Sequence, residues 1–269
     1  MKIAGGEVWR ATRTPLGPAT VHFRRDGDQI ALTAWGPGGE WLLDRGPALV
    51  GLEDLPGDFA PRHPLVRDLH RRRPGLRFGA TGAVVEAMIC SVLEQRVTGM
   101  EAWRAYRLLV RRYSEPAPGP AELMLPPDPG VLSRLGYYDL HPFGIERRRA
   151  DTLLRVCANA PRLDAAATMS PPQAAALFTR IPGIGAWTAA EVGRVALGDS
   201  DAVSVGDLHI PHLVSWTLAG EPRGNDARML ELLEPYRGRR ARAVRLLELS
   251  GITAPRRGPR YRPIPIARL

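Results

Sequence analysis

A five-residue link between two predicted helices is the sequence feature that most constrains the fold of this chain. The link reads Ile181-Pro182-Gly183-Ile184-Gly185, and helices are predicted on either side of it, over about 171–179 and 186–197. Two glycines in so short a connection allow a tight turn and a close approach to the backbone. The second helix would begin with N–H groups that lack helical partners and that, with the helix dipole, can bind a phosphate. Alone, the link is equally typical of an ordinary helix–turn–helix connection.

A carboxylate downstream of this link is the candidate catalytic group. Asp207 follows Gly185 by 22 residues, after a loop that contains Ser204 and Gly206, and it precedes a predicted helix over 208–218. Aspartate is a preferred N-cap, so capping alone would explain its presence. The two roles are compatible, because a capping aspartate keeps its charge and can still face a cleft.

The hydrophobic pattern divides the chain into a β-rich beginning and a helical remainder. Strand-forming residues at 19–24 and 29–35 flank Asp26-Gly27, which is typical of a hairpin turn, and Trp41–Leu43 is expected to start a third strand. Apolar periodicity and capping motifs such as Thr98–Glu101 predict helices further on. In addition to the helices next to the link and after Asp207, the predicted helices cover 83–95, 98–113, 131–135, 146–159 and 229–249.

The link and Asp207 together resemble the helix-hairpin-helix (HhH-GPD) superfamily of DNA glycosylases. The stretch from Pro182 to Ala189 is similar to bacterial 3-methyladenine DNA glycosylases II, and Val205–Ile210 is similar to a Val-Asp-Thr-His-Ile stretch of endonucleases III. The stretch from Val92 to Thr98 resembles a Leu-x-Gln-x-Val-Ser segment of the 3-methyladenine enzymes. The resemblance implies a mainly α fold with a β-rich N-terminal part (α+β). We expect an antiparallel-sheet domain over 1–65, a helical glycosylase domain over 66–250 and a basic, proline-rich tail over 251–269.

The resemblance implies hydrolysis of the N-glycosidic bond of a damaged base that has been flipped out of duplex DNA. Asp207 would stabilise the positive charge that develops on the sugar and orient or deprotonate the attacking water. The residues implied in DNA binding are Gly183, Ile184, Gly185, Thr188, Gln95 and Arg96. Gln95 and Arg96 align with the wedge that fills the gap left by the base, although Arg96 stands where the 3-methyladenine enzymes have an apolar residue. An ordinary phosphate or solvent contact would explain Arg96 equally well.

The same resemblance implies a base pocket and a cation site at the link. Trp187 would stack on the base and attract a cationic one by about 0.5–2 kcal/mol, or it is simply a core anchor. Glu191 and Arg245 replace a tyrosine and a tryptophan of the pocket, and their charges could pair with each other. The resemblance therefore does not decide which damaged base is excised. The cation, Na⁺ or K⁺, would bind backbone carbonyls of Thr179, Ile181 and Ile184.

Composition excludes several classes of protein. The net charge of +9 favours a polyanionic partner, and Lys2 is the only lysine, so a Schiff-base strand-cleaving step is disfavoured. Two cysteines, Cys90 and Cys157, are too few for a four-cysteine iron–sulfur cluster, and we expect reduced core thiols and no required cofactor. No apolar run is long enough to span a bilayer. We expect a cytoplasmic, nucleoid-associated monomer. The arginine clusters at 71–73, 147–149 and 237–245 are consistent with phosphate contacts, but for any one of them an ordinary solvated surface is the favoured interpretation.

Three functions remain open at this point. The first is a monofunctional glycosylase for damaged purines, with alkylated purines favoured. The second is a DNA-binding protein that keeps the link but has lost a working pocket, which the charged residues Glu191 and Arg245 favour and Asp207 opposes. The third is a glycosylase for oxidised or mismatched bases.

Overall fold

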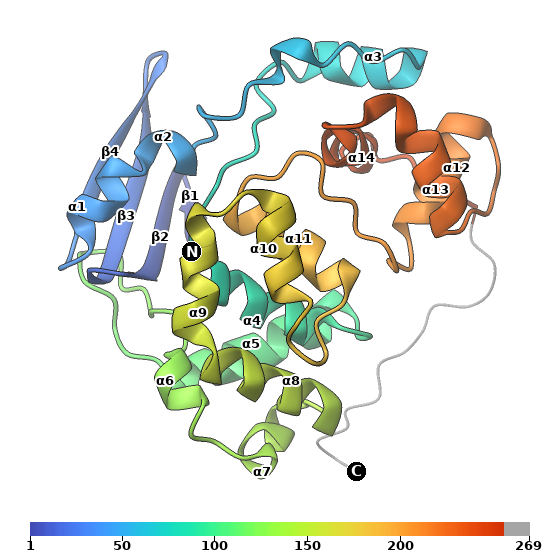
Figure 1. Cartoon of the computed structure of the whole chain (residues 1–269). Helices are drawn as coiled ribbons and strands as arrows, with labels where there is room; N and C mark the ends of the chain where they lie inside the picture. Colours follow the sequence, from blue (N-terminus) through green and yellow to red (C-terminus); the bar gives the residue numbers. More distant parts are fainter. Residues whose placement is uncertain (256–269) are drawn as a thin grey trace.

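A computed structural model describes residues 1–255, so most of the predicted basic tail lies outside the described residues. The chain is mainly α-helical, with one four-stranded sheet at its N-terminal end, as predicted (Figure 1). Within residues 1–255, no helix is both long enough and apolar enough to cross a membrane.

The sheet is an antiparallel meander with its strands in chain order. The strands are β1 (Lys2–Ala4), β2 (Glu7–Thr14), β3 (Gly17–Asp26) and β4 (Gln29–Trp35). Asp26 pairs with Gln29, so a two-residue turn joins β3 to β4, and Gly27 adopts the positive φ of +64° that such turns require. The predictions of β3, β4 and their turn are confirmed. The pairing also includes β1 and β2, which the sequence pattern does not single out.

The prediction of a third strand at Trp41–Leu43 is wrong. These residues lie in helix α1 (Gly39–Asp44), which is followed by α2 (Gly46–Leu49). Helix α1 crosses one face of the sheet, where Leu42 is fully buried against Ala19 and Val21 of β3 (Figure 1). The run Trp41-Leu42-Leu43 has no alternation that would distinguish strand from helix, and packing against the sheet decides the outcome.

The helical part of the chain forms two units with separate cores. The first core is formed mainly by α4 (Val84–Glu94), α5 (Gly99–Tyr113), α8 (Arg147–Ala158), α9 (Ala160–Asp164), α10 (Pro171–Phe178) and α11 (Ala186–Ala196). The second is formed mainly by α3 (Pro64–Arg72), α12 (Ile210–Ala219), α13 (Asp226–Leu233) and α14 (Arg240–Glu248). Short helices α6 (Pro129–Leu132) and α7 (Tyr137–Leu140), with 3₁₀ turns at Pro56–Asp58, His141–Phe143, Ala165–Thr168 and Glu234–Tyr236, complete the described elements.

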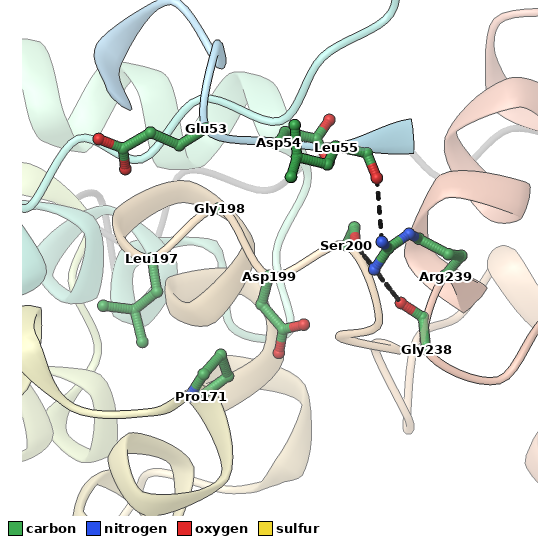
Figure 2. A pocket seen from close by; sticks show the side chains of 10 residues that line it. All are labelled: Glu53, Asp54, Leu55, Pro171, Leu197, Gly198, Asp199, Ser200, Gly238 and Arg239. Carbon is green, nitrogen blue, oxygen red and sulfur yellow. Dashed lines mark hydrogen bonds between the residues drawn. The ribbon is translucent and has the colours of Figure 1, made fainter. Parts of the chain in front are cut away.

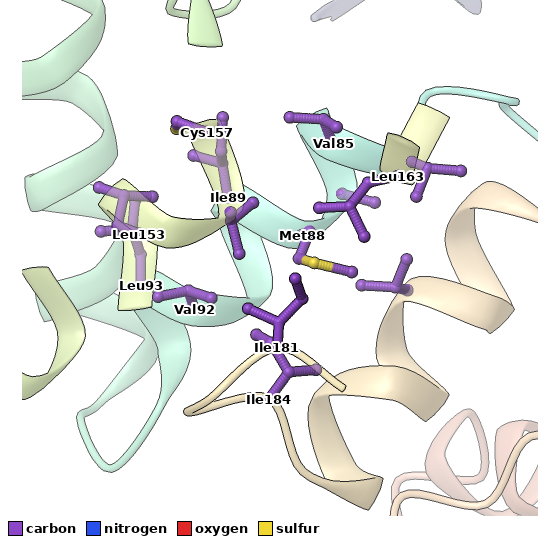
Figure 3. Packing of buried hydrophobic residues seen from close by; sticks show 14 of the residues in the cluster. Val85, Met88, Ile89, Val92, Leu93, Leu153, Cys157, Leu163, Ile181 and Ile184 are labelled. Atoms are coloured by element: carbon purple, nitrogen blue, oxygen red, sulfur yellow. The ribbon is translucent and has the colours of Figure 1, made fainter. Parts of the chain in front are cut away.

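The first core contains both isoleucines of the link. Ile181 and Ile184 are 8% and 5% exposed and lie beside Met88 of α4 in the packed cluster (Figure 3). Burial of an isoleucine side chain contributes about 1.5–3 kcal/mol. The link is therefore anchored to the core at two points, with Pro182 and Gly183 exposed between them.

Polar contacts join the N-terminal part of the chain to both helical units. Glu86 of α4 accepts hydrogen bonds from Arg10 Nη2 at 2.9 Å and from Thr12 Oγ1 at 2.6 Å, which ties the sheet to the first unit. Asp54, in the connection before α3, forms an ion pair with Arg242 of α14, and their side chains are 6% and 0% exposed. This second pair is buried, so each charge depends on the other for compensation.

Replacement of Asp54 by alanine should lower the free energy of unfolding by about 3–5 kcal/mol, because it leaves the Arg242 guanidinium buried without a counter-charge. Glu234→Ala is the matched control, since it breaks an ion pair with Arg237 in which both side chains are more than half exposed. Urea denaturation should show a large loss for Asp54→Ala and little change for the control. Equal midpoints would contradict the importance of the buried pair.

Candidate active site

The link between α10 and α11 forms a tight turn. Ile184 N donates to Ile181 O at 3.0 Å, with Pro182 and Gly183 at the two central positions and Gly183 at a φ of +98°. Proline at the first position and a positive φ at the second are typical of a type II turn. A β-carbon on Gly183 would lie 2.1 Å from Thr152 Oγ1, so both conformation and space require glycine there.

The second glycine of the link has a different environment. Gly185 has a φ of −102°, and a β-carbon on it would meet no atom within 4 Å. Neither conformation nor packing therefore requires glycine at this position. Helix α11 follows at once, and the hydrogen bond that opens it runs from Ala189 N to Gly185 O at 3.0 Å. The preceding N–H groups belong to the helix end that attracts anions.

Gln95 connects the end of α4 to the link. Its side-chain amide donates to Gly183 O at 3.0 Å and to Thr188 Oγ1 at 2.9 Å. Thr188 is 2% exposed, so almost none of this residue is accessible to another molecule. The neighbouring Arg96 is exposed and adopts a φ of +56°, which costs a non-glycine residue about 1–2 kcal/mol. Such strain is often found at functional positions.

Asp207 lies beside the start of α11 and is held from two sides. Its Oδ2 accepts a hydrogen bond from Trp187 Nε1 at 3.0 Å. Its Oδ1 accepts from His209 N at 2.7 Å and from Ile210 N at 2.9 Å, at the beginning of α12. The carboxylate therefore accepts from two N–H groups at the start of α12, although His209 is the residue at the N-cap position. It is also tied to a residue two positions after the link. The residue is half-buried, so part of it stays accessible.

A small pocket lies between the two helical units. Glu191 and Arg194 of α11 face Ser204 in the loop before Asp207, and Arg245 of α14 lines the opposite side. Glu191 Oε1 accepts from Ser204 Oγ at 2.5 Å, and Arg194 forms an ion pair with the other oxygen. Burial and the nearby Glu191 carboxylate raise the pKa of Glu94, an effect that Arg194 partly offsets. The pocket volume of 20 Å³ holds about one water molecule.

The predicted pairing between Glu191 and Arg245 is wrong, although both residues line this pocket. Glu191 pairs with Arg194, three residues further along α11. Arg245 pairs with Glu248, three residues further along α14, at 3.1 Å. Each charge has a partner on its own helix, and side chains three residues apart on a helix are neighbours.

Solved structures of DNA glycosylases are similar to this chain. A 3-methyladenine DNA glycosylase from Archaeoglobus fulgidus matches with a TM-score of 0.74 and 20% identity, over 91% of this chain and 87% of that one. MBOgg1, solved with a low-affinity DNA ligand, matches with a TM-score of 0.71 and 14% identity, over 88% and 86%. An 8-oxoguanine glycosylase/lyase from Clostridium acetobutylicum, solved with double-stranded DNA that contains cytosine opposite 8-oxoguanine, matches with a TM-score of 0.67 and 12% identity, over 88% and 86%.

The chain has the helix-hairpin-helix glycosylase fold. No protein-family model matches it, and no curated protein sequence does. We call Ile181–Gly185, which joins α10 to α11, the hairpin from here on.

A larger hollow of 360 Å³ lies away from the hairpin. Its walls are residues 53–55, 197–200 and 238–239 with Pro171, and none of the residues predicted for catalysis, the base pocket, the hairpin or the wedge lines it (Figure 2). Arg239 closes one side by donating to Leu55 O and Gly238 O, each at 3.0 Å. Burial raises the pKa of Asp199 in this wall. The hollow is therefore separate from the site around Asp207.

The predicted arginine clusters are largely engaged within the protein. Arg149 and Arg242 are buried, and Arg149 donates to the carbonyls of Leu93 and Gly144. Most of the others form ion pairs, and all of these except the Arg240 pair join residues three or four positions apart in the sequence. These pairs are Arg71 and Arg72 with Asp68, Arg147 with Asp151, Arg237 with Glu234, Arg240 with Asp201 and Arg245 with Glu248.

Asp207→Ala should destabilise the protein by about 1–2 kcal/mol, because the two N–H groups at the start of α12 lose their acceptor. Asp207→Asn should cost less, since its amide oxygen can still accept. Thermal unfolding of the two variants measures the difference. A loss as large for asparagine as for alanine would contradict the capping role.

Proposed function

We propose that the protein is a monofunctional DNA glycosylase of base-excision repair that acts on damaged purines, with alkylated purines as the first candidates. The observation that carries this proposal is the Asp207 carboxylate, which is partly accessible and held beside the hairpin by Trp187 at 3.0 Å. The fold shared with DNA glycosylases supports it.

DNA binding would begin at the hairpin. A phosphate would approach the open space beside Gly185 and accept hydrogen bonds from N–H groups at the start of α11. A monovalent cation, Na⁺ or K⁺, fits this arrangement as a further proposal: backbone oxygens of Thr179, Ile181 and Ile184 would bind it and supply positive charge toward the phosphate. Ile181 O already accepts from Ile184 N, so the cation would use its second lone pair.

The target base would leave the helix at a cost of a few kcal/mol, and Arg96 would occupy the gap. The pocket is too small for a purine as it stands, so entry requires movement of the charged side chains that line it. Trp187 would contact the base with its ring while its Nε1 holds Asp207.

The chemical step would depend on Asp207. As the bond to the base breaks, the sugar gains positive charge, which a carboxylate stabilises while it orients or deprotonates the attacking water. An alkylated purine that already carries positive charge leaves without a strong general acid. Since Lys2 is the only lysine of the chain, a lysine-based lyase step is not part of the proposal. We further propose that the protein acts as a monomer on cytoplasmic, nucleoid-associated DNA.

A non-catalytic DNA-binding protein is the second candidate. The small pocket with its Glu191–Arg194 ion pair favours it, because these charges would need to separate or move before a base could enter. The accessible carboxylate of Asp207 favours the enzyme. A glycosylase for oxidised or mismatched bases is a third candidate, which a panel of lesions separates from the first.

Duplexes that each carry one lesion should yield abasic sites with the wild-type protein, detected as strand breaks after alkali treatment. Asp207→Asn should reduce the excision rate by at least about 100-fold, because the transition state loses its counter-charge. Affinity for a duplex with an abasic-site analogue should change little. Absence of product for alkylated, deaminated and oxidised lesions alike would instead favour the DNA-binding protein.

The two glycines of the hairpin offer a matched pair of variants. Gly185→Ala should fold normally and bind DNA at least about tenfold more weakly, because its methyl group enters the space where the phosphate would lie. Gly183→Ala should lower stability as well, because of its φ and the contact with Thr152. Anisotropy titrations with labelled duplex, alongside thermal unfolding, separate the two effects. Unchanged affinity of Gly185→Ala would count against a phosphate site there.

A further inference from the structure

Helix α5 carries arginines that are not neutralised within the protein. Arg104, Arg107 and Arg111 are exposed, and among residues 1–255 no carboxylate lies within ion-pair distance of them. The one carboxylate in this helix, Glu101, forms the capping box with Thr98. The predicted clusters contrast with this helix, because most of their exposed arginines are paired. Uncompensated positive charge is thus concentrated where the sequence does not suggest a cluster.

The arginines share one face of α5 with two exposed apolar residues. We define the α5 stripe as Met100, Trp103, Arg104, Arg107 and Arg111. At 100° per residue these positions cover roughly a third of the helix circumference. The opposite face carries Ala102, Ala105 and Leu109, which are buried in the first core. The stripe therefore points away from the core along the whole helix.

The apolar members of the stripe are unusually accessible. Met100 is 74% exposed and Trp103 is 60% exposed. The Arg107 guanidinium lies 4.4 Å from the centroid of the Trp103 ring, a cation–π contact that holds the indole on the surface. A surface with both arginine and tryptophan suits a sugar-phosphate chain, since guanidinium groups bind phosphates and the ring can contact apolar faces of the nucleotide.

The position of α5 relates this surface to the hairpin. Gln95 binds the hairpin directly, Arg96 follows it, and α5 begins at Gly99 (Figure 1). With 15 residues, the helix is about 22 Å long, which corresponds to roughly six base-pair steps. A duplex gripped at the hairpin therefore needs only to continue past Arg96 to reach the first turn of the stripe.

We infer that the α5 stripe is a second DNA-binding surface, which contacts the sugar-phosphate backbone of the duplex held at the hairpin, several base pairs from the flipped nucleotide. The inference rests on the proposed function, because that function supplies the DNA duplex bound at the hairpin. It adds a contact surface outside the hairpin, the wedge region and the pocket.

The test compares two triple variants that remove the same charge. Arg104→Gln/Arg107→Gln/Arg111→Gln removes the arginines of the stripe, and Arg71→Gln/Arg72→Gln/Arg237→Gln removes three that form ion pairs. Anisotropy titrations over a range of salt concentrations use duplexes of about 25 and about 10 base pairs, each with a central abasic-site analogue. Circular dichroism serves to check that both variants are folded.

On the long duplex, the stripe variant should bind at least about tenfold more weakly, and its slope of log affinity against log salt should fall by about 2–3. On the short duplex, whose arms of about five base pairs reach only the first turn of the stripe, the loss relative to the control variant should be clearly smaller. Trp103→Ala should weaken binding to the long duplex about threefold or more with the same salt slope, because no charge is lost. Excision from the short duplex should be unaffected in all of these variants.

Three outcomes would overturn the inference. In the first, the stripe variant and the control variant lose the same affinity. In the second, the loss is equal on long and short duplexes, which would indicate a non-specific effect of charge. In the third, the wild-type protein self-associates and the Trp103→Ala variant does not. That result would show that the stripe binds a second copy of the chain and not DNA. If the wild-type protein binds neither duplex, the proposed function fails as well, whereas the first two outcomes leave it intact.

Discussion

Burial of Ile181 and Ile184 in the first helical core is the contact on which the geometry of the site depends. These two side chains fix the Pro182-Gly183 turn between them, and the turn sets the position at which α11 begins. Helix α11 in turn places Trp187, whose Nε1 holds the Asp207 carboxylate from across the loop. Ordinary apolar packing thus determines where a charged group lies, at a distance of some 20 residues along the chain. The polar site needs little rigidity of its own, because its support comes from the core.

The ion pairs that individual arginines form describe the surface of this protein better than its net charge does. The net charge of +9 indicates a polyanionic partner, yet many arginines face carboxylates a turn away on their own helix. Exposed pairs of this kind contribute little to stability, but they reduce the local field that a phosphate would experience. The same kind of pairing occurs in the pocket, since Glu191 and Arg245 each form an ion pair within their own helix. Electrostatic attraction would then depend on surfaces such as α5, where among the described residues no carboxylate forms an ion pair with the exposed arginines.

Local chemistry explains which features could be predicted from the sequence. The Pro-Gly pair indicates the turn at 181–184, the Thr98–Glu101 capping box indicates the start of α5, and Asp26-Gly27 indicates the β3–β4 hairpin. The features that depend on distant contacts were missed or wrong. Trp41–Leu43 became helical because it packs on the sheet, and the bond between Gln95 and the hairpin joins residues 88 positions apart. The position of Asp207 as a cap was predictable, but its contact with Trp187 was not, since only the fold brings the two together.

The bond between Gln95 and the hairpin has a mechanical consequence. The side-chain amide of Gln95 joins Gly183 O to Thr188 Oγ1, and Arg96 is the next residue in the chain, so the turn and the strained arginine are connected through Gln95. The separation between a gripped phosphate and an inserted guanidinium would then be set before DNA arrives. On the proposed function, this fixed spacing would determine which nucleotide along the strand is presented to Asp207.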